Sequence, residues 1–154
     1  MGHVPRRHQE VTSPDRGPIV VDTNVFGAGL TPRSVPLAHR YDRLVVGRRQ
    51  LVSFQTVMEL ESGAHIAGWG QARQLKLRSL VAGAEVVWPG PELTTTCAAL
   101  RAECWQTGHA LAQPEHSADL WIAATAVHLD LPLVADDGIF SRVPGLRLDT
   151  VTNG

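Results

Sequence analysis

Short apolar runs alternate with longer stretches of helical periodicity along most of this 154-residue sequence. The first run, 18–22, is rich in β-branched residues and bounded by proline and an acidic residue, which is typical of a buried strand. Four similar runs follow it. The expected strands cover residues 18–22, 50–54, 85–88, 131–135 and 146–148. This alternation predicts an α/β fold, a three-layer α/β/α domain with a mainly parallel central sheet.

The stretches between the expected strands carry apolar residues at three- and four-residue spacing, which predicts helices. The expected helices cover residues 23–30, 34–47, 56–67, 75–81, 92–107 and 114–129. No linker rich in proline, glycine or serine divides the chain, so we expect one domain over residues 18–151. Residues 1–17 are polar and lack an apolar period, which predicts a flexible N-terminal tail.

The sequence offers no sign of a membrane segment or of export. No apolar run approaches the roughly 18 residues of a membrane-spanning helix, and the N-terminal stretch lacks the apolar centre of a signal peptide. Cys97 and Cys104 are seven residues apart on one expected helix, so their Cα atoms would lie about 10 Å apart, too far for a disulfide. We therefore expect a cytoplasmic protein with no membrane partner.

Acidic residues recur where the expected strands end. Asp22 ends the first strand, and Asp136 and Asp137 end the fourth, while Glu59 and Asp119 lie in the first turns of the helices at 56–67 and 114–129. Ligands of open parallel sheets bind beyond the carboxyl ends of the strands. Two like charges about 4 Å apart repel by roughly 4 kcal/mol at an effective dielectric constant near 20, so such a cluster calls for a cation. The carboxylate oxygens of such a cluster favour Mg²⁺ or Mn²⁺ as that cation.

Each acid also has a purely structural interpretation. Asp22 and Asp137 are placed to cap the helix or turn that follows. Glu59 and Asp119 are placed where a negative charge favours a helix N-terminus by about 0.3–1 kcal/mol. Taken one at a time, capping explains each acid at least as well as metal binding does. Taken together they favour the metal site, because four caps need not converge and four ligands must.

Four segments combine these acids with apolar strands and helices in a fixed order. They are Ile19-Val20-Val21-Asp22-Thr23-Asn24, Ser53–Leu60, Ala118–Ala126, and Leu133–Asp137 followed by Phe140. This ordered set resembles the PIN-domain ribonucleases, and among them the VapC toxins of bacterial toxin–antitoxin pairs. The resemblance covers nearly the whole chain outside the tail, from about Pro18 to Val151, and implies a PIN-like nuclease domain over 18–151.

Carried over position by position, the resemblance implies a set of four acids that are both catalytic and metal-binding: Asp22, Glu59, Asp119 and Asp137. Ala135 stands where the family commonly has threonine or serine, so a hydroxyl is missing from the edge of the implied site. The neighbouring Asp136 is an alternative for the fourth acid, although the spacing to Phe140 favours Asp137. Asn24 matches the family's Asp-x-Asn or Asp-x-Ser start, which implies that it orients Asp22 or a metal-bound water.

The resemblance also implies an activity and partners. The implied activity is that of a Mg²⁺-dependent ribonuclease, with Mn²⁺ as an alternative ion, which hydrolyses phosphodiester bonds in structured RNA such as tRNA or rRNA. The implied role is the toxin of a toxin–antitoxin system. Its implied partners are an RNA substrate, a small VapB-like antitoxin and a second copy of the chain in a homodimer.

Charge is distributed unevenly along the chain. The formal net charge of −1 argues against a protein that coats DNA without specificity. Residues 33–78 hold eight basic and three acidic side chains, whereas 79–154 hold three basic and nine acidic ones. The expected RNA-phosphate contacts in the basic part are Arg48, Arg49, Arg73 and Arg78. The alternative is that these arginines only form solvated helix faces.

Two other functions compete with this interpretation, and three other residues have structural explanations. A catalytically silent PIN-like RNA-binding module would be expected to lack one or more of the acids. A phosphohydrolase of the haloacid dehalogenase type usually needs a second acid where Asn24 stands. We expect His116 to be an exposed residue at a helix start, because Mg²⁺ prefers oxygen ligands. Trp121 is expected in the core or an interface, and Tyr41 has no evident catalytic partner.

Overall fold

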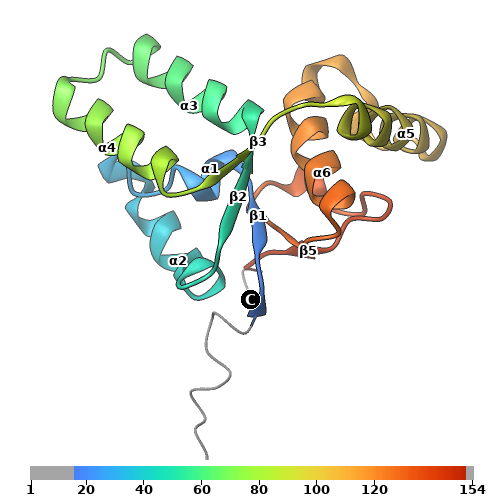
Figure 1. Cartoon of the computed structure of the whole chain (residues 1–154), viewed down its shortest axis with the longest axis horizontal. Helices are drawn as coiled ribbons and strands as arrows, with labels where there is room; N and C mark the ends of the chain where they lie inside the picture. Colours follow the sequence, from blue (N-terminus) through green and yellow to red (C-terminus); the bar gives the residue numbers. More distant parts are fainter. Residues whose placement is uncertain (1–15, 152–154) are drawn as a thin grey trace, which may run out of the picture.

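The computed structural model describes residues 16–151, which form a five-stranded sheet flanked by helices (Figure 1). The strands are β1 (Ile19–Val21), β2 (Gln50–Ser53), β3 (Glu85–Val87), β4 (Leu133–Val134) and β5 (Leu148–Asp149). They lie in the order β3-β2-β1-β4-β5, and every neighbouring pair is parallel. The predicted α/β fold with a mainly parallel sheet is confirmed.

Helices cover both faces of this sheet, so the domain has three layers (Figure 1). One layer holds α1 (Thr23–Phe26), α2 (Val35–Val45), α3 (Phe54–Ile66) and α4 (Gln71–Ala82). The other holds α5 (Pro91–Thr107) and α6 (Ser117–Leu129). Short 3-10 turns complete the connections: η3 (Pro32–Ser34), η4 (Ala110–Ala112), η5 (Pro114–His116) and η6 (Gly138–Phe140).

The alternating side chains of the central strand β1 divide the core between the two layers. Val20 packs into the cluster formed with α5 and α6, whereas Ile19 and Val21 pack into the cluster formed with α1 and α2. All three are completely buried. A parallel strand covered on both faces must be apolar at every position, which explains the unbroken β-branched run in the sequence.

All five strands are one to three residues shorter than expected, and the last two differ most in their bounds. Residues 131–135 supply only Leu133 and Val134 to β4, because the Leu131 N–H still donates to the Ala126 carbonyl at the end of α6. Pro132 has no N–H to donate, so pairing begins after it. The last strand comprises Leu148 and Asp149, shifted from the expected 146–148. Both differences concern strand ends, where contacts along the chain compete with pairing.

The N-terminal part of the expected tail falls outside the described residues. Residues 1–15 belong to that part, whereas Arg16 and Gly17 both accept hydrogen bonds from the Arg48 guanidinium through their carbonyl oxygens. Within residues 16–151, no helix combines the length and the apolar character needed to cross a membrane.

Candidate functional site

The carboxyl ends of β1 and β4 meet at the centre of the sheet. From β1 the chain continues to β2 and β3 on one side, and later returns to β4 on the other side of β1. This reversal of strand order marks the place where open α/β sheets bind their ligands. Asp22 follows β1 directly, and Asp136 and Asp137 follow β4 after Ala135. The structure thus brings together acids that are more than a hundred residues apart in the sequence.

Asp22 is a buried carboxyl at this point, only 2% exposed. One of its oxygens accepts a hydrogen bond from the Val25 N–H at 2.9 Å and so caps α1. Burial raises the pKa of Asp22 from 3.8 to about 7, with smaller contributions from the charges of Asp136 and Asp137, while the backbone N–H groups of Val25 and Asp136 work against the rise. Asp22 therefore caps α1, but capping does not require burial among other acids. This burial makes the ionised form of the carboxyl unfavourable.

Glu59 and Asp119 come to the site near the starts of two helices from opposite layers. Asp119 lies in the first turn of α6, as expected, whereas Glu59 lies in the second turn of α3, because α3 begins at Phe54, two residues earlier than expected. The rings of Phe54 on α3 and Trp121 on α6 meet edge to face, with centroids 5.4 Å apart, and join the starts of the two helices. Burial raises the pKa of Glu59, and the charge of Asp119 raises it further. The aromatic contact thus brings the starts of the two helices together, and the two carboxyls that they carry repel each other.

The two carboxyls differ in their partners. Oε1 of Glu59 is buried without a hydrogen-bond partner among the described residues, although a hydrogen bond from Thr23 moderates the pKa rise of this side chain. Burial also raises the pKa of Asp119, and the charge of Asp137 adds to the rise. His116 lies 3.5 Å from Asp119 and lowers this pKa in return. His116 is half-buried, so it is more than the exposed helix-start residue that we expected.

The four acids predicted from the sequence are linked by these mutual repulsions. Glu59 is coupled to Asp119, Asp119 to Asp137, and Asp137 to Asp22. Even so, no three His, Cys, Asp or Glu side chains within residues 16–151 come close enough to each other to hold a metal ion as they stand. The four carboxyls are thus close enough to repel one another but do not form a preorganised set of metal ligands.

The chemistry of this donor set fits a hard divalent cation. All four candidates offer carboxylate oxygens, the ligands that Mg²⁺ prefers. Oε1 of Glu59 has no partner, and the pKa values of Asp22, Glu59 and Asp119 are raised by burial and by neighbouring negative charge. A cation would relieve both conditions, because it would give the free oxygen a partner and would offset the repulsion.

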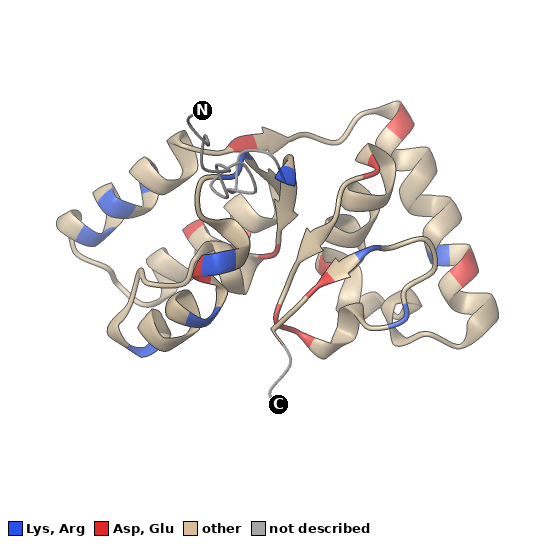
Figure 2. Cartoon of the chain, turned by 90° about the horizontal axis from the view of Figure 1, so that it is seen from below, with Lys and Arg blue, Asp and Glu red and all other residues tan. Residues whose placement is uncertain are grey.

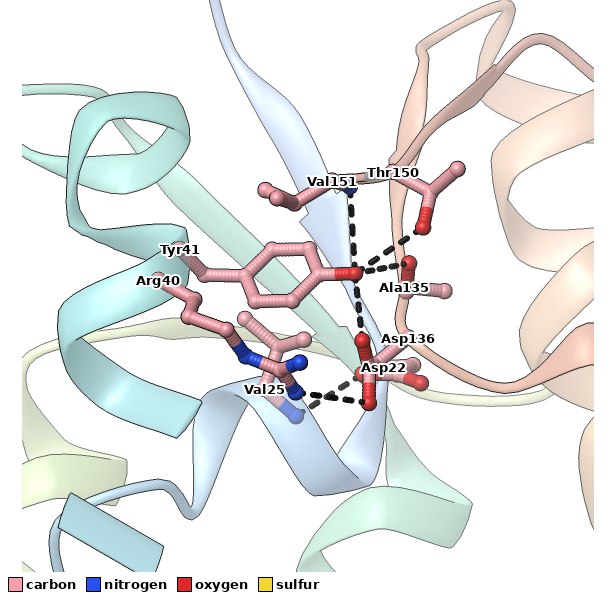
Figure 3. Close-up of polar contacts among 8 residues, drawn as sticks. All are labelled: Asp22, Val25, Arg40, Tyr41, Ala135, Asp136, Thr150 and Val151. Carbon is pink, nitrogen blue, oxygen red and sulfur yellow. Dashed lines mark hydrogen bonds and ion pairs between the residues drawn. The ribbon is translucent and has the colours of Figure 1, made fainter. Parts of the chain in front are cut away.

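Asp136 and Asp137 have different surroundings although they are adjacent. The Asp136 carboxylate accepts a 2.7 Å hydrogen bond from the Tyr41 hydroxyl and is paired with Arg40 at 3.4 Å, so it is held by α2 (Figure 3). Asp137 accepts a hydrogen bond from the Ile139 N–H at 3.0 Å and caps η6. Asp137 is also coupled to Asp119, which favours it over Asp136 as the fourth acid.

Tyr41 is the residue that sequence reasoning missed. It is completely buried, and its hydroxyl contacts atoms at the end of β4 and just after β5. The available signal was a single tyrosine on the apolar face of an expected helix, but nothing in the sequence indicated which distant residues it would meet. Trp121, by contrast, lies in the packing between layers, as expected.

The four predicted RNA-binding arginines do not form one surface. Arg48 is only 9% exposed, and its guanidinium donates to the carbonyl oxygens of Arg16, Gly17 and Leu44. Arg49 is exposed and pairs with Glu85, the first residue of β3. Both arginines precede β2, so they lie at the amino edge of the sheet, opposite the acids. Neither guanidinium therefore lies beside the acids, where we expected both.

The other two predicted arginines remain accessible. Arg73 and Arg78 are exposed on α4, and Arg73 lies over the ring of Trp69, 5.4 Å from its centroid. Most of the Lys and Arg residues are in the layer of α1–α4 (Figure 2). The basic and acidic halves of the sequence therefore correspond in part to the two sides of the sheet.

Comparisons with known proteins agree on one family. The PIN domain family model matches residues 19–146. A chain of VapBC2 from Rickettsia felis bound to a promoter DNA fragment is similar in structure, with a TM-score of 0.70 and 22% identity over 86% of this chain and 98% of that one. DNA-bound VapBC from Salmonella typhimurium gives 0.69 and 23% over 87% and 98%. VapBC-5 from Mycobacterium tuberculosis gives 0.63 and 25% over 88% and 98%. No curated protein sequence matches the chain.

Proposed function

The chain belongs to the PIN domain family, and from that membership we propose that it is a metal-dependent ribonuclease, the toxin of a toxin–antitoxin pair. The observation that carries this proposal is the group of mutually repelling acids at the switch point of the sheet, one of which has an unpartnered buried oxygen. Residues 18–151 would form the nuclease domain. The deciding experiment measures Mg²⁺-dependent cleavage of total cellular RNA by the wild-type protein and by variants of the acids.

Four residues would hold the metal and carry the reaction: Asp22, Glu59, Asp119 and Asp137. A bound Mg²⁺ or Mn²⁺ would supply positive charge for the scissile phosphate and lower the pKa of the attacking water. In this proposal Asp22 and Asp119 are the principal ligands, while Glu59 and Asp137 hold a second ion or orient water. The Val25 N–H orients the Asp22 carboxylate, the Asp136 N–H lowers its pKa, and His116 holds the carboxylate of Asp119.

The partners that we propose are inferred from the similar solved structures. Several of these are VapBC complexes, and the M. tuberculosis one reaches 25% identity over 88% of this chain, which supports a VapB-like antitoxin as partner. We also propose a homodimer, action in the cytoplasm, and structured RNA such as tRNA or rRNA as substrate.

A catalytically silent RNA-binding module is the second candidate, because no three potential ligands within residues 16–151 are close enough to hold an ion. Family membership gives no support to a haloacid dehalogenase-type phosphohydrolase.

We expect the two adjacent aspartates at the end of β4 to respond differently to substitution. Asp137→Asn should lower the cleavage rate by about 10²-fold, since it removes a charge from the acidic group. Asp136→Asn should lower it by less than about threefold, because an amide oxygen still accepts the Tyr41 hydrogen bond. Initial cleavage rates at saturating Mg²⁺ provide the measurement. A larger loss in the Asp136 variant would make Asp136 the fourth acid.

The exposed arginines of α4 are proposed to contact RNA phosphates. Replacing Arg73 and Arg78 together with glutamine should weaken RNA binding and make the dependence of log K on log salt concentration shallower by about 1–2. The matched control is Arg49→Gln, which removes an exposed arginine that pairs with Glu85 at the opposite edge of the sheet. Binding would be titrated in Ca²⁺ across a range of salt concentrations. Equal slopes for the double variant and the wild type would remove α4 from the RNA surface.

A further inference from the structure

The Tyr41 hydroxyl lies where three distant segments of the chain meet (Figure 3). Tyr41 belongs to α2, and its hydroxyl oxygen is 3.1 Å from the Ala135 carbonyl oxygen and 2.7 Å from Oδ1 of Asp136, both just beyond β4. The same oxygen is 2.9 Å from the Thr150 hydroxyl and 3.2 Å from the Val151 nitrogen, both beyond β5. One buried atom thus connects a helix to the ends of two neighbouring strands.

The hydrogen-bonding capacity of this hydroxyl is fully used. A phenol has one proton to donate and can accept through its lone pairs. The Val151 N–H can only donate, so it donates to the hydroxyl oxygen. The shortest contact is to the Asp136 carboxylate, which can only accept, so the phenol proton is directed there. Thr150 then donates as well, and the phenol has no freedom to turn.

The turn that Tyr41 holds carries two groups of the acidic site. The Asp22 N–H donates to the Val134 carbonyl oxygen at 3.0 Å, the Asp136 backbone N–H lowers the pKa of the Asp22 carboxyl, and Asp137 is the next residue. Without the phenol proton, the Asp136 side chain would depend on its exposed pairing with Arg40 at 3.4 Å. The peptide that points at Asp22 would then be free to shift. Loosening of groups that orient ligands typically lowers activity by 10–100-fold.

We propose that Tyr41 is a positioning residue of the candidate active site, which acts through Asp136 to hold the 135–137 turn against Asp22. This inference rests on the proposed ribonuclease function. The Tyr41 hydroxyl is hydrogen-bonded to none of the four acids assigned to the metal, so its effect is on their arrangement. Its loss should therefore lower the rate of the chemical step more than the affinity for RNA.

The test compares Tyr41→Phe with a matched variant, Thr125→Val. Both remove one buried hydroxyl and keep the side-chain volume nearly constant, but the Thr125 hydroxyl bonds only within α6, to the Trp121 carbonyl at 2.8 Å. We expect Tyr41→Phe to lower kcat by about 10–100-fold with KM within about threefold of the wild type. Thr125→Val should keep kcat within about threefold of the wild type even if its Tm falls.

A second measurement does not depend on activity. In the metal-free protein, amide hydrogen exchange at Asp136 and Asp137 should be faster by about 10-fold in Tyr41→Phe and unaltered in Thr125→Val. If Tyr41→Phe does not fold, Asp136→Ala replaces it, since it removes the same hydrogen bond from a partly exposed side chain. Asp136→Asn, which retains an acceptor, should restore most of the activity lost in Asp136→Ala.

The outcomes separate this inference from the proposed function. A wild-type protein that cleaves no RNA in Mg²⁺ would overturn the proposed function. An active wild type with equal kcat in Tyr41→Phe would overturn the positioning role alone. So would equal losses of kcat and Tm in Tyr41→Phe and Thr125→Val, because a general loss of stability would then explain both. A fall in kcat confined to Tyr41→Phe, together with faster exchange at the turn, is the result that supports it.

Discussion

The Asp22→Asn protein is expected to fold normally and to cleave RNA about 10²–10³-fold more slowly than the wild type. Asparagine has nearly the same shape, and its carbonyl oxygen can still accept the 2.9 Å hydrogen bond from the Val25 N–H that begins α1. The substitution removes only the charge that would bind the cation. Asp119→Asn should have an effect of similar size for the same reason. The measurement is the initial rate on total cellular RNA in Mg²⁺, repeated in excess chelator.

The matched control for these two variants is Asp42→Asn. Asp42 is an exposed acid on α2 whose carboxyl group has no part in the proposed site. Its variant should cleave RNA at the wild-type rate, which would show that loss of a negative charge elsewhere is harmless. Equal cleavage by the wild type, Asp22→Asn and Asp119→Asn would remove both residues from the reaction and with them the proposed centre.

The second large effect concerns the stability of the metal-free protein, which should fall as the pH rises from about 4 to about 7. In the unfolded chain Asp22 loses its proton near pH 3.8, whereas in the folded protein it keeps it up to about pH 7. Between these values the folded state binds more protons, so the free energy of unfolding decreases with rising pH. At 1.36 kcal/mol for each pH unit the total loss reaches about 4 kcal/mol, and it is complete above pH 7.

Urea unfolding in chelator at pH 5 and pH 8 would measure about 2.7 kcal/mol of this loss, because about two of the pH units over which it accrues lie between these values. Asp22→Asn should remove most of it and should be more stable than the wild type at pH 8, since it has no buried charge to form. A smaller loss should persist, because burial also raises the pKa values of Glu59 and Asp119. Mg²⁺ should stabilise the wild type at pH 8 and have little effect on Asp22→Asn. A wild-type stability that rises between pH 5 and pH 8 would contradict the buried charge on Asp22.

The arginines of residues 33–78 illustrate what the sequence leaves open. The charge count correctly indicated that residues 33–78 carry an excess of basic side chains, but the direction of each side chain was not contained in that count. The Arg48 guanidinium donates its hydrogen bonds to backbone carbonyl oxygens, which include those of Arg16 and Gly17, some thirty positions earlier in the chain. Arg49 pairs with the start of a neighbouring strand. Such partners are set by strand order, which periodicity alone does not give.

The amino-acid sequence by itself determined the alternation of strands and helices and the positions of Asp22, Glu59, Asp119 and Asp137 within them. It could do so because burial on one face or on both imposes a local period on side chains. Only the tertiary structure decided which of these groups meet, that Asp136 is held by Tyr41 from 95 residues away, and that the acids repel one another without forming a closed cage. Those outcomes depend on packing between distant segments, for which no local pattern exists.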